Sequence, residues 1–373
     1  MSPLPLMRVA GIRIVIDPTW LIVFALVVIS LGGDYIPQAA PHVSTPGAWT
    51  LGVIAAVLLF GSVLLHELSH ALLARRAGIH VPRIRLFLFG GVSEMAAEPH
   101  EPRAELRIAA AGPATSLLLS AFTAVLQRVF TGPGPTGMHV LLGYLATANL
   151  LLGLFNLLPG LPLDGGRILR AWLWSRHGNL LRATRTAGRA GTAIGFGFIG
   201  LGFLLLVMQV YVSGLWLAVL GFFLTRAASA SYQTALLRDM LAGVRVRQLM
   251  VRDAITVQDH LSLDEMVQET ILRHPHRVYP VMNGDQLIGL IGIEQVRRVP
   301  RPEWVRTPVR QVMTPTAQMP PVAPEDESVI VLERMIREDA LLLPVVQEGR
   351  MVGILSRGDI LQHFQIRSTL AAP

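Results

Sequence analysis

The sequence has 373 residues, enough for two or three domains of ordinary size. It is 52% hydrophobic and 15% charged. A soluble domain usually carries about 25% charged residues, so much of this surface must face something other than water. The absence of cysteine excludes disulfides, thiolate metal sites and cysteine nucleophiles. The net charge of +7 comes from arginines in particular loops, without interleaved aromatic residues, which argues against direct nucleic-acid binding.

Six apolar stretches are long enough to cross or nearly cross a bilayer, which takes about 20 helical residues. They lie near residues 17–33, 50–76, 104–130, 138–159, 190–211 and 213–230. Asp17 and Pro18 give the first stretch an N-cap and a proline at the first helical position. No signal-peptidase-like site follows that stretch, so we expect it to be retained as an anchor. Just before it, Ile12, Ile14 and Ile16 alternate along the chain as in a short strand.

The loops between these stretches differ in charge. Residues 33–49 and 131–140 contain no arginine, whereas residues 75–107 and 160–190 are rich in it. Because positive loops stay in the cytoplasm, this alternation predicts a multi-pass protein of the cell membrane with both termini cytoplasmic. The alternative, a soluble protein with buried helices, fits the length of the stretches less well.

The second apolar stretch contains His66-Glu67-Leu68-Ser69-His70. Residues four apart share one face of a helix, so both imidazoles can reach one metal ion. Glu67 lies beside them, placed to take a proton from a metal-activated water. Ionisable groups inside a membrane helix are costly and usually functional. A polar patch that stabilises a helix bundle is the structural alternative.

A catalytic zinc needs a third protein ligand and an open position for water. The segment 155–167 offers the best candidate, because prolines and glycines break the fourth apolar stretch there, and irregular backbone in a membrane must line a cavity or be buried. Asp164 supplies a carboxylate, and Asn156 supplies an amide that can hold a carbonyl oxygen. Asp164 could instead serve only as an N-cap for the helix that carries Arg167 and Arg170.

From about residue 242 the chain becomes more polar and repeats itself with an offset of 63 to 64 residues. The segment 246–250, for example, is echoed by 309–313. Each repeat is predicted to run strand, helix, strand, strand, helix, with Asn283-Gly284 and Glu348-Gly349 as hairpin turns. These patterns predict a membrane domain over residues 1–241 and two small domains over residues 242–304 and 305–373.

The HELSH helix, the later FNLLPGLPLDGGR segment and the six-helix layout resemble the site-2 protease family of intramembrane zinc metalloproteases. More narrowly, the chain is similar to the branch with C-terminal CBS domains and to the sporulation pro-sigma-factor protease. The resemblance implies one Zn2+ bound by His66, His70 and Asp164, with Glu67 as general base and acid. It also implies that Asn156 contacts the scissile carbonyl or the oxyanion, and that the substrate is a single-pass or membrane-tethered regulatory protein cleaved in the bilayer.

Two further segments match the family. Ala111-Gly112-Pro113 corresponds to its helix kink, although a helix-packing role fits as well. Residues 84–92 look like a hairpin that dips into the membrane beside the active site, where an exposed edge could receive an unwound substrate. An ordinary interfacial loop is the alternative, since the region is rich in arginine.

The repeat resembles a tandem pair of CBS domains, so the expected fold is a polytopic α-helical membrane protein with a small membrane-associated β-sheet, followed by an α/β CBS pair. The resemblance implies an adenine nucleotide, ATP, ADP or AMP, at a ribose signature formed by Gly353, Ser356 and Asp359. The first repeat has Gly292 and Gln295 at the two polar positions, so we expect one competent site at most. A purely structural pair, or one that forms a homodimer, is the alternative.

Tandem CBS domains also occur on channels and transporters, so a CBS-regulated membrane transporter is the rival function. It would use the intramembrane histidines and glutamate as an ion path. A transporter does not require the combination of HExxH and Asp164, which favours the protease.

Overall fold

The computed structural model describes residues 4–88, 90–95, 97–130, 136–252, 254–318, 320–338 and 340–370. Its internal contacts divide it into two compact units, one that ends at Ala235 and one that begins at Leu236.

In the described part of the chain, six helical spans are long and apolar enough to cross a membrane, which confirms the six predicted stretches. The first begins at α1, capped by the Asp17 carboxylate, which accepts a hydrogen bond from Thr19 N at 3.0 Å. The six are α1 (Pro18–Ser30) with a π-helical turn (Leu31–Tyr35) and α2 (Ile36–Ala39), α3 (Thr45–Arg76), α4 (Pro102–Phe130), α5 (Gly137–Asn156), α7 (Leu180–Val207) and α8 (Tyr211–Leu241). A shorter helix, α6 (Asp164–His177), connects α5 to α7.

Large apolar side chains on these helices are exposed in the isolated chain. Leu118 on α4 is 71% exposed, Phe203 on α7 is 67% exposed, and Val212 on α8 is 86% exposed. Soluble monomers rarely present continuous apolar surface on this scale. A lipid-facing surface accounts for it.

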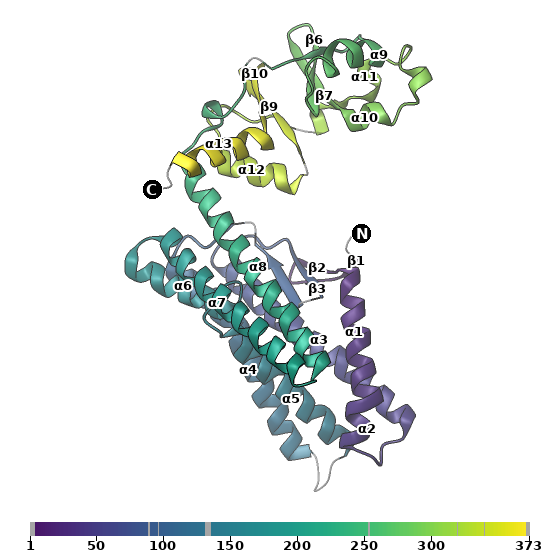
Figure 1. Ribbon diagram of the computed structural model, residues 1–373, viewed down its shortest axis with the longest axis vertical. Coiled ribbons are helices and arrows are strands. Elements are labelled where there is room, and N and C mark those ends of the chain that lie inside the picture. Colours follow the sequence, from purple (N-terminus) through teal and green to yellow (C-terminus); the bar gives the residue numbers. More distant parts are fainter. Residues whose placement is uncertain are drawn as a thin grey trace. The chain divides into compact units, whose positions relative to one another are not determined.

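A small sheet accompanies the helices in the first unit. Its strands are β1 (Leu4–Val9), β2 (Ile12–Ile16), β3 (Arg83–Phe87) and β4 (Gly90–Glu94). They are hydrogen-bonded in that order, with β2 parallel to β3 and the other pairs antiparallel. The sheet packs on the end of α3 that carries the two histidines, because Ile12 and Ile84 share a core with Ala71 of α3 and Ile108 of α4 (Figure 1). Strand β4 is one edge of this sheet.

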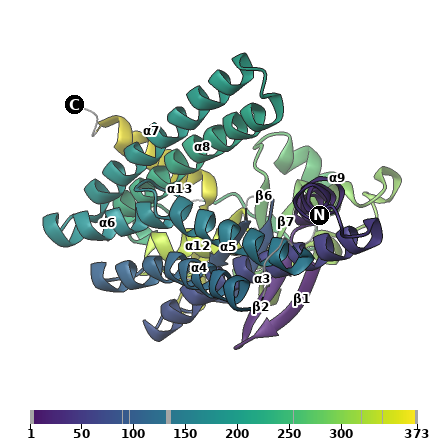
Figure 2. The ribbon, with the colours of Figure 1, turned by 90° about the horizontal axis from the view of Figure 1, so that it is seen from below.

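Figures 1 and 2 show α7 and α8 side by side, and glycines make this close approach feasible. A Cβ added at Gly202 would lie 2.7 Å from the Gly214 carbonyl oxygen, and one added at Gly221 would lie 2.5 Å from the Gly195 carbonyl oxygen. Small residues at helix contacts are the usual means of packing helices in a membrane.

The second unit contains two small sheets. The strands of the first are β5 (Val257–Gln258), β6 (Val278–Asn283), β7 (Gln286–Gly292) and β8 (Thr314–Pro315), hydrogen-bonded in that order, and those of the second are β9 (Leu342–Gln347) and β10 (Arg350–Ser356). The helices are α9 (Leu263–Glu265) with a π-helical turn (Met266–Ile271), α10 (Ile293–Arg297), α11 (Val309–Val312), α12 (Ser328–Arg337) and α13 (Arg357–Leu370).

The two repeats exchange their opening segments. Val246, at the start of the first repeat, packs in the core that contains Leu343 of the second, whereas Val309, at the start of the second, packs in the core that contains Tyr279 of the first. Each repeat therefore completes the core of the other.

The predicted hairpins are present. The second turns on Glu348 and Gly349, both with positive φ, as predicted. The first pairs Asn283 with Gln286, so its turn consists of residues 284 and 285 and begins one residue later than predicted.

Candidate metal centre

Helix α3 brings His66, Glu67 and His70 together. Its first turn is capped by Ser44, whose hydroxyl accepts a hydrogen bond from Gly47 N. The helix then runs for 32 residues, and the two histidines lie one turn apart in its second half. Each is only 3% exposed, and their ring centroids are 5.0 Å apart. The HExxH spacing therefore does place both imidazoles on one buried face.

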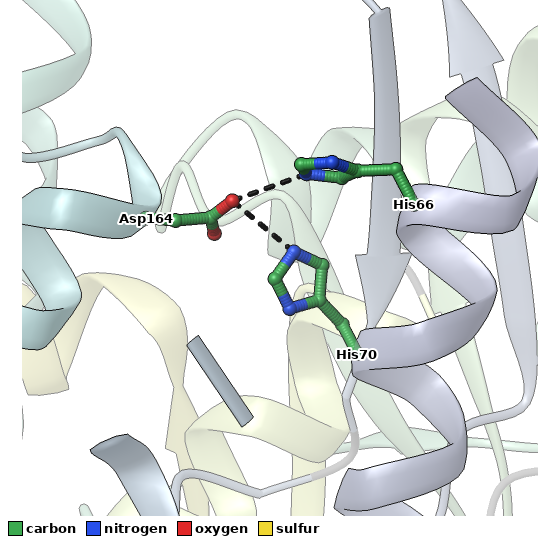
Figure 3. A group of neighbouring side chains, drawn as sticks. All are labelled: His66, His70 and Asp164. Carbon is green, nitrogen blue, oxygen red and sulfur yellow. Dashed lines mark hydrogen bonds and ion pairs between the residues drawn. The ribbon is translucent and has the colours of Figure 1, made fainter. Parts of the chain in front are cut away.

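The loop between α5 and α6 positions Asp164 opposite these rings. Glycines let this loop fold tightly: a Cβ at Gly165 would lie 2.2 Å from the Leu157 carbonyl oxygen, and one at Gly191 of α7 would lie 1.8 Å from the Leu161 carbonyl oxygen. Leu163 occupies the N-cap position of α6, and Asp164 is the first helical residue. The Asp164 carboxylate points at the two histidines (Figure 3).

The three side chains have the spacing of metal ligands. Asp164 Oδ2 lies 3.1 Å from His66 Nε2 and 3.2 Å from His70 Nε2, and the three candidate ligand atoms all lie within 4.8 Å of one another. Tetrahedral zinc with ligand bonds of about 2.0–2.1 Å requires its ligand atoms to be about 3.3 Å apart. The two contacts of Asp164 lie within about 0.2 Å of that value.

The outer nitrogens of the two rings have partners on α4. His70 Nδ1 donates to the Ile108 carbonyl oxygen at 2.6 Å, and His66 Nδ1 lies 2.9 Å from Ser116 Oγ. A carbonyl oxygen only accepts, so a neutral His70 carries its proton on Nδ1 and presents a lone pair on Nε2. That lone pair faces a carboxylate oxygen, so a cation, either a proton or a metal ion, must lie between the two atoms. The donor set of two imidazoles and one carboxylate fits Zn2+.

Glu67 is partly buried beside this cluster and is held by the sheet. Its Oε2 accepts a hydrogen bond from Ser93 Oγ of the edge strand β4 at 2.9 Å. A Cβ at Gly91 of the same strand would lie 2.4 Å from Glu67 Cγ. The predicted hairpin at residues 84–92 is present as β3 and β4, although Phe89 lies outside the described residues. The edge strand therefore runs directly against the proposed general base.

Gly112 of α4 has a steric role that sequence reasoning did not identify. A Cβ at this position would lie 2.2 Å from His70 Nε2 and 2.5 Å from His66 Nε2, in the space between the two candidate ligand atoms. The sequence offered Gly112 only as part of a kink or a helix contact, because no pattern in the sequence shows where two helices cross.

Asn156 is the last residue of α5, at the other end of the loop that delivers Asp164. Its Nδ2 donates to the Leu152 carbonyl oxygen of its own helix at 3.0 Å. Within the described residues, no hydrogen bond joins Asn156 to His66, His70 or Asp164. This bond uses one of the two N–H groups of the amide.

Two cavities of the second unit contain residues of the ribose signature or their counterparts in the first repeat. Ser356 and Asp359 line one of about 540 Å³, together with Arg277 and Arg357, and Asp359 Oδ2 accepts from Ser356 N and Oγ at 2.9 and 2.7 Å. Gly353 is not among the lining residues, and a Cβ there would lie 2.7 Å from the Val251 carbonyl oxygen, so a side chain at this position would not fit without a shift.

The other cavity, of about 630 Å³, is lined by Gly292 and Gln295 of the first repeat and by Leu341 and Leu342 of the second. Gln295 Oε1 accepts from Gly292 N at 3.1 Å, as Asp359 accepts from Ser356 N, and Gln295 Nε2 donates to Thr314 Oγ1 at 3.2 Å. An amide thus replaces the carboxylate of the second repeat.

Comparison with known proteins shows the family of the chain. The family model described as Peptidase family M50 matches residues 54–135 and 134–202, and the CBS domain model matches residues 246–301 and 309–366. Rip3 of Mycobacterium tuberculosis is 38% identical over 366 residues, which cover 97% of this chain and 93% of Rip3. The chain belongs to peptidase family M50.

Zinc metalloprotease MJ0392 of Methanocaldococcus jannaschii is 30% identical over 316 residues, which cover 83% of this chain and 84% of that protein. The structure of a site-2 protease from the same organism is 30% identical and covers 62% of this chain and 95% of that one, with a TM-score of 0.44.

As an M50 peptidase, this chain is a zinc metalloendopeptidase of the site-2 protease type, a multi-pass membrane protein with tandem CBS domains. The predicted family is confirmed. Membership also decides between protease and transporter, in favour of the protease.

Proposed function

We propose that this M50 peptidase cleaves single-pass or membrane-tethered proteins within the bilayer, at a zinc centre formed by His66, His70 and Asp164. One observation carries the proposal: Asp164 Oδ2 meets two Nε2 atoms that lie 98 and 94 residues away in sequence, at the spacing of zinc ligands. A bound zinc ion supplies Lewis acidity, which lowers the pKa of a water molecule and polarises a carbonyl group.

Glu67 acts as the general base and then as the general acid. It accepts the proton of the attacking water and returns that proton to the leaving amine. The hydrogen bond from Ser93 Oγ to Glu67 Oε2 at 2.9 Å supports this role, because it fixes one carboxylate oxygen and leaves the other for the water.

Asn156 supports the developing oxyanion. Its amide is half-buried, and the bond to the Leu152 carbonyl oxygen uses one of its two N–H groups, so the other can donate to the oxyanion. Donors aimed at the oxyanion are usually worth about 10²–10³ in rate.

Strand β4 receives the substrate. A helical substrate hides its carbonyl groups in backbone hydrogen bonds, so it must unwind locally before cleavage. An edge strand offers unpaired N–H and C=O groups to such an extended segment. Ser93 and Gly91 of β4 both lie against Glu67, so a segment added at this edge would lie next to the general base.

The active site lies in the cytoplasmic half of the membrane. Arg75 and Arg76 close the last turn of α3, and arginine-rich loops mark the cytoplasmic side. His66 lies ten residues before Arg76, about 15 Å along the helix at 1.5 Å per residue. Both chain termini are then cytoplasmic, which places the CBS pair in the cytoplasm.

Adenine nucleotides regulate the protease through the CBS pair. The cavity of about 540 Å³ combines a carboxylate, Asp359, that can hold ribose hydroxyls with two arginines, Arg277 and Arg357, that can bind phosphate.

We also propose that the CBS pair forms a homodimer. The mass of the purified protein in detergent, measured by light scattering with and without ATP, tests this; a monomer under both conditions refutes it.

A substrate trap tests the substrate class. The Glu67→Gln variant is expressed in its host, crosslinked to the proteins it holds and purified. It should retain single-pass membrane proteins that the wild type cuts within their membrane segment. Retained proteins that wild-type enzyme leaves intact, or cuts only in soluble domains, would contradict the proposal.

A further inference from the structure

One face of α4 organises the whole metal centre. Glu105, Ile108, Gly112 and Ser116 are spaced by three or four residues, so they share a face, and all four are buried. Glu105 contacts Arg170, and Gly112 lies against the Nε2 atoms of both imidazoles. Ile108 contacts Nδ1 of His70, and Ser116 contacts Nδ1 of His66. Three of the four residues touch the histidines of α3, and Glu105 forms an ion pair with Arg170 of α6.

The contact with α6 is a buried ion pair. Arg170 Nε donates to Glu105 Oε1 at 2.7 Å, and Arg170 Nη2 donates to the same oxygen. Glu105 is 1% exposed and Arg170 is 8% exposed. Removing two charges from water is expensive, and apolar residues of similar volume often stabilise a fold as well or better. Stability alone is therefore a weak reason for this pair.

Its position suggests another reason. Asp164 opens α6 and Arg170 lies six residues further along, about 9 Å at 1.5 Å per residue. Both histidines belong to α3 and are held by α4, whereas the third candidate ligand arrives on a different helix. The depth and rotation of α6 on α4 must therefore be fixed if Asp164 Oδ2 is to meet both Nε2 atoms.

We propose that the Glu105–Arg170 pair positions the metal centre, by locking α6 onto α4 so that Asp164 meets His66 and His70 at ligand distance. The paired donors of one guanidinium restrain direction as well as distance, which a single apolar contact does not. The inference rests on the proposed zinc site. Glu105 and Arg170 touch neither metal nor substrate, so they are positioning residues.

The test compares zinc affinity with fold stability. The double variant Glu105→Leu/Arg170→Met replaces the pair with apolar side chains of similar size, and Arg176→Met, at an exposed position of the same helix, is the matched control. Zinc dissociation constants of the full-length protein in detergent are measured by chelator competition, and thermal unfolding of the metal-free protein is followed by circular dichroism.

We expect the double variant to unfold at the wild-type temperature and to bind zinc at least about 10-fold more weakly, the usual loss when support of a metal ligand is removed. Arg176→Met should bind zinc as the wild type does. Wild-type affinity in the double variant would overturn the inference.

If the double variant does not fold, Arg170→Lys, which keeps the positive charge and removes the paired guanidinium donors, decides in the same assay. Affinity within about twofold of wild type would again overturn the inference, and a loss of about 10-fold would support it. A wild-type protein without a tightly bound zinc ion would instead refute the proposed metal site itself, so the two failures are distinguishable.

Discussion

The substitution Gly112→Ala adds one methyl group at the point where the two imidazoles converge. The new Cβ would lie 2.2 Å from His70 Nε2 and 2.5 Å from His66 Nε2, whereas ordinary contact begins at 3.4 Å. The His70 ring would therefore have to retreat by roughly 1.2 Å, more than half the length of a zinc–nitrogen bond of about 2.0–2.1 Å. We expect a displacement of this size to weaken zinc binding by about 100-fold, or about 2.8 kcal/mol at about 1.4 kcal/mol per tenfold change in the dissociation constant.

Zinc affinity by chelator competition measures this effect, with Gly61→Ala as the control. Gly61 lies on α3, the helix of both histidines, and a Cβ there meets nothing within 4 Å. Because alanine favours a helix over glycine by about 1 kcal/mol, neither variant should unfold more easily through loss of helix propensity. We expect Gly112→Ala to lose zinc and cleavage while Gly61→Ala keeps both. Wild-type zinc affinity in Gly112→Ala would refute the placement of the metal between the two rings.

Three further variants test other parts of the account. Ser116→Ala removes the partner of His66 Nδ1 and should weaken zinc binding by about 10–100-fold, whereas Ser120→Ala, one turn along the same face of α4, should leave the zinc dissociation constant unchanged. Asp164→Ala should lower the zinc content of the purified protein, measured by atomic absorption, and unchanged stoichiometry would remove this residue from the ligand set. Asp359→Ala should abolish the heat of binding of ATP, ADP and AMP to the full-length protein in titration calorimetry; no heat with the wild type would favour a purely structural CBS pair.

Local spacing was enough to predict some of the site. Residues four apart share a helix face whatever surrounds the helix, so His66 and His70 were predictable from the sequence. The apolar stretches were also predictable, since a membrane fixes the length of a helix that crosses it. The same holds for the repeat, because each copy carries its own strands and turns.

Contacts between helices were not predictable in this way. Whether Asp164 caps α6 or faces the histidines depends on the tight path of the preceding loop. The broken apolar stretch and the family resemblance favoured the second option, but neither shows that path. Gly112 and the Glu105–Arg170 pair depend on where α3, α4 and α6 cross. The exchange of opening segments between the repeats is likewise invisible in the sequence, because each segment packs on a core formed by residues far along the chain.

The most direct test of the proposed active site is the substitution Glu67→Gln in the full-length protein. The amide keeps the size of the side chain but cannot accept the proton of the attacking water. Zinc content and cleavage of a membrane substrate are measured on the same preparation, beside the wild type. We predict one zinc ion per chain and no cleavage. Substantial proteolysis by Glu67→Gln would contradict the assignment of Glu67 and the mechanism built on it.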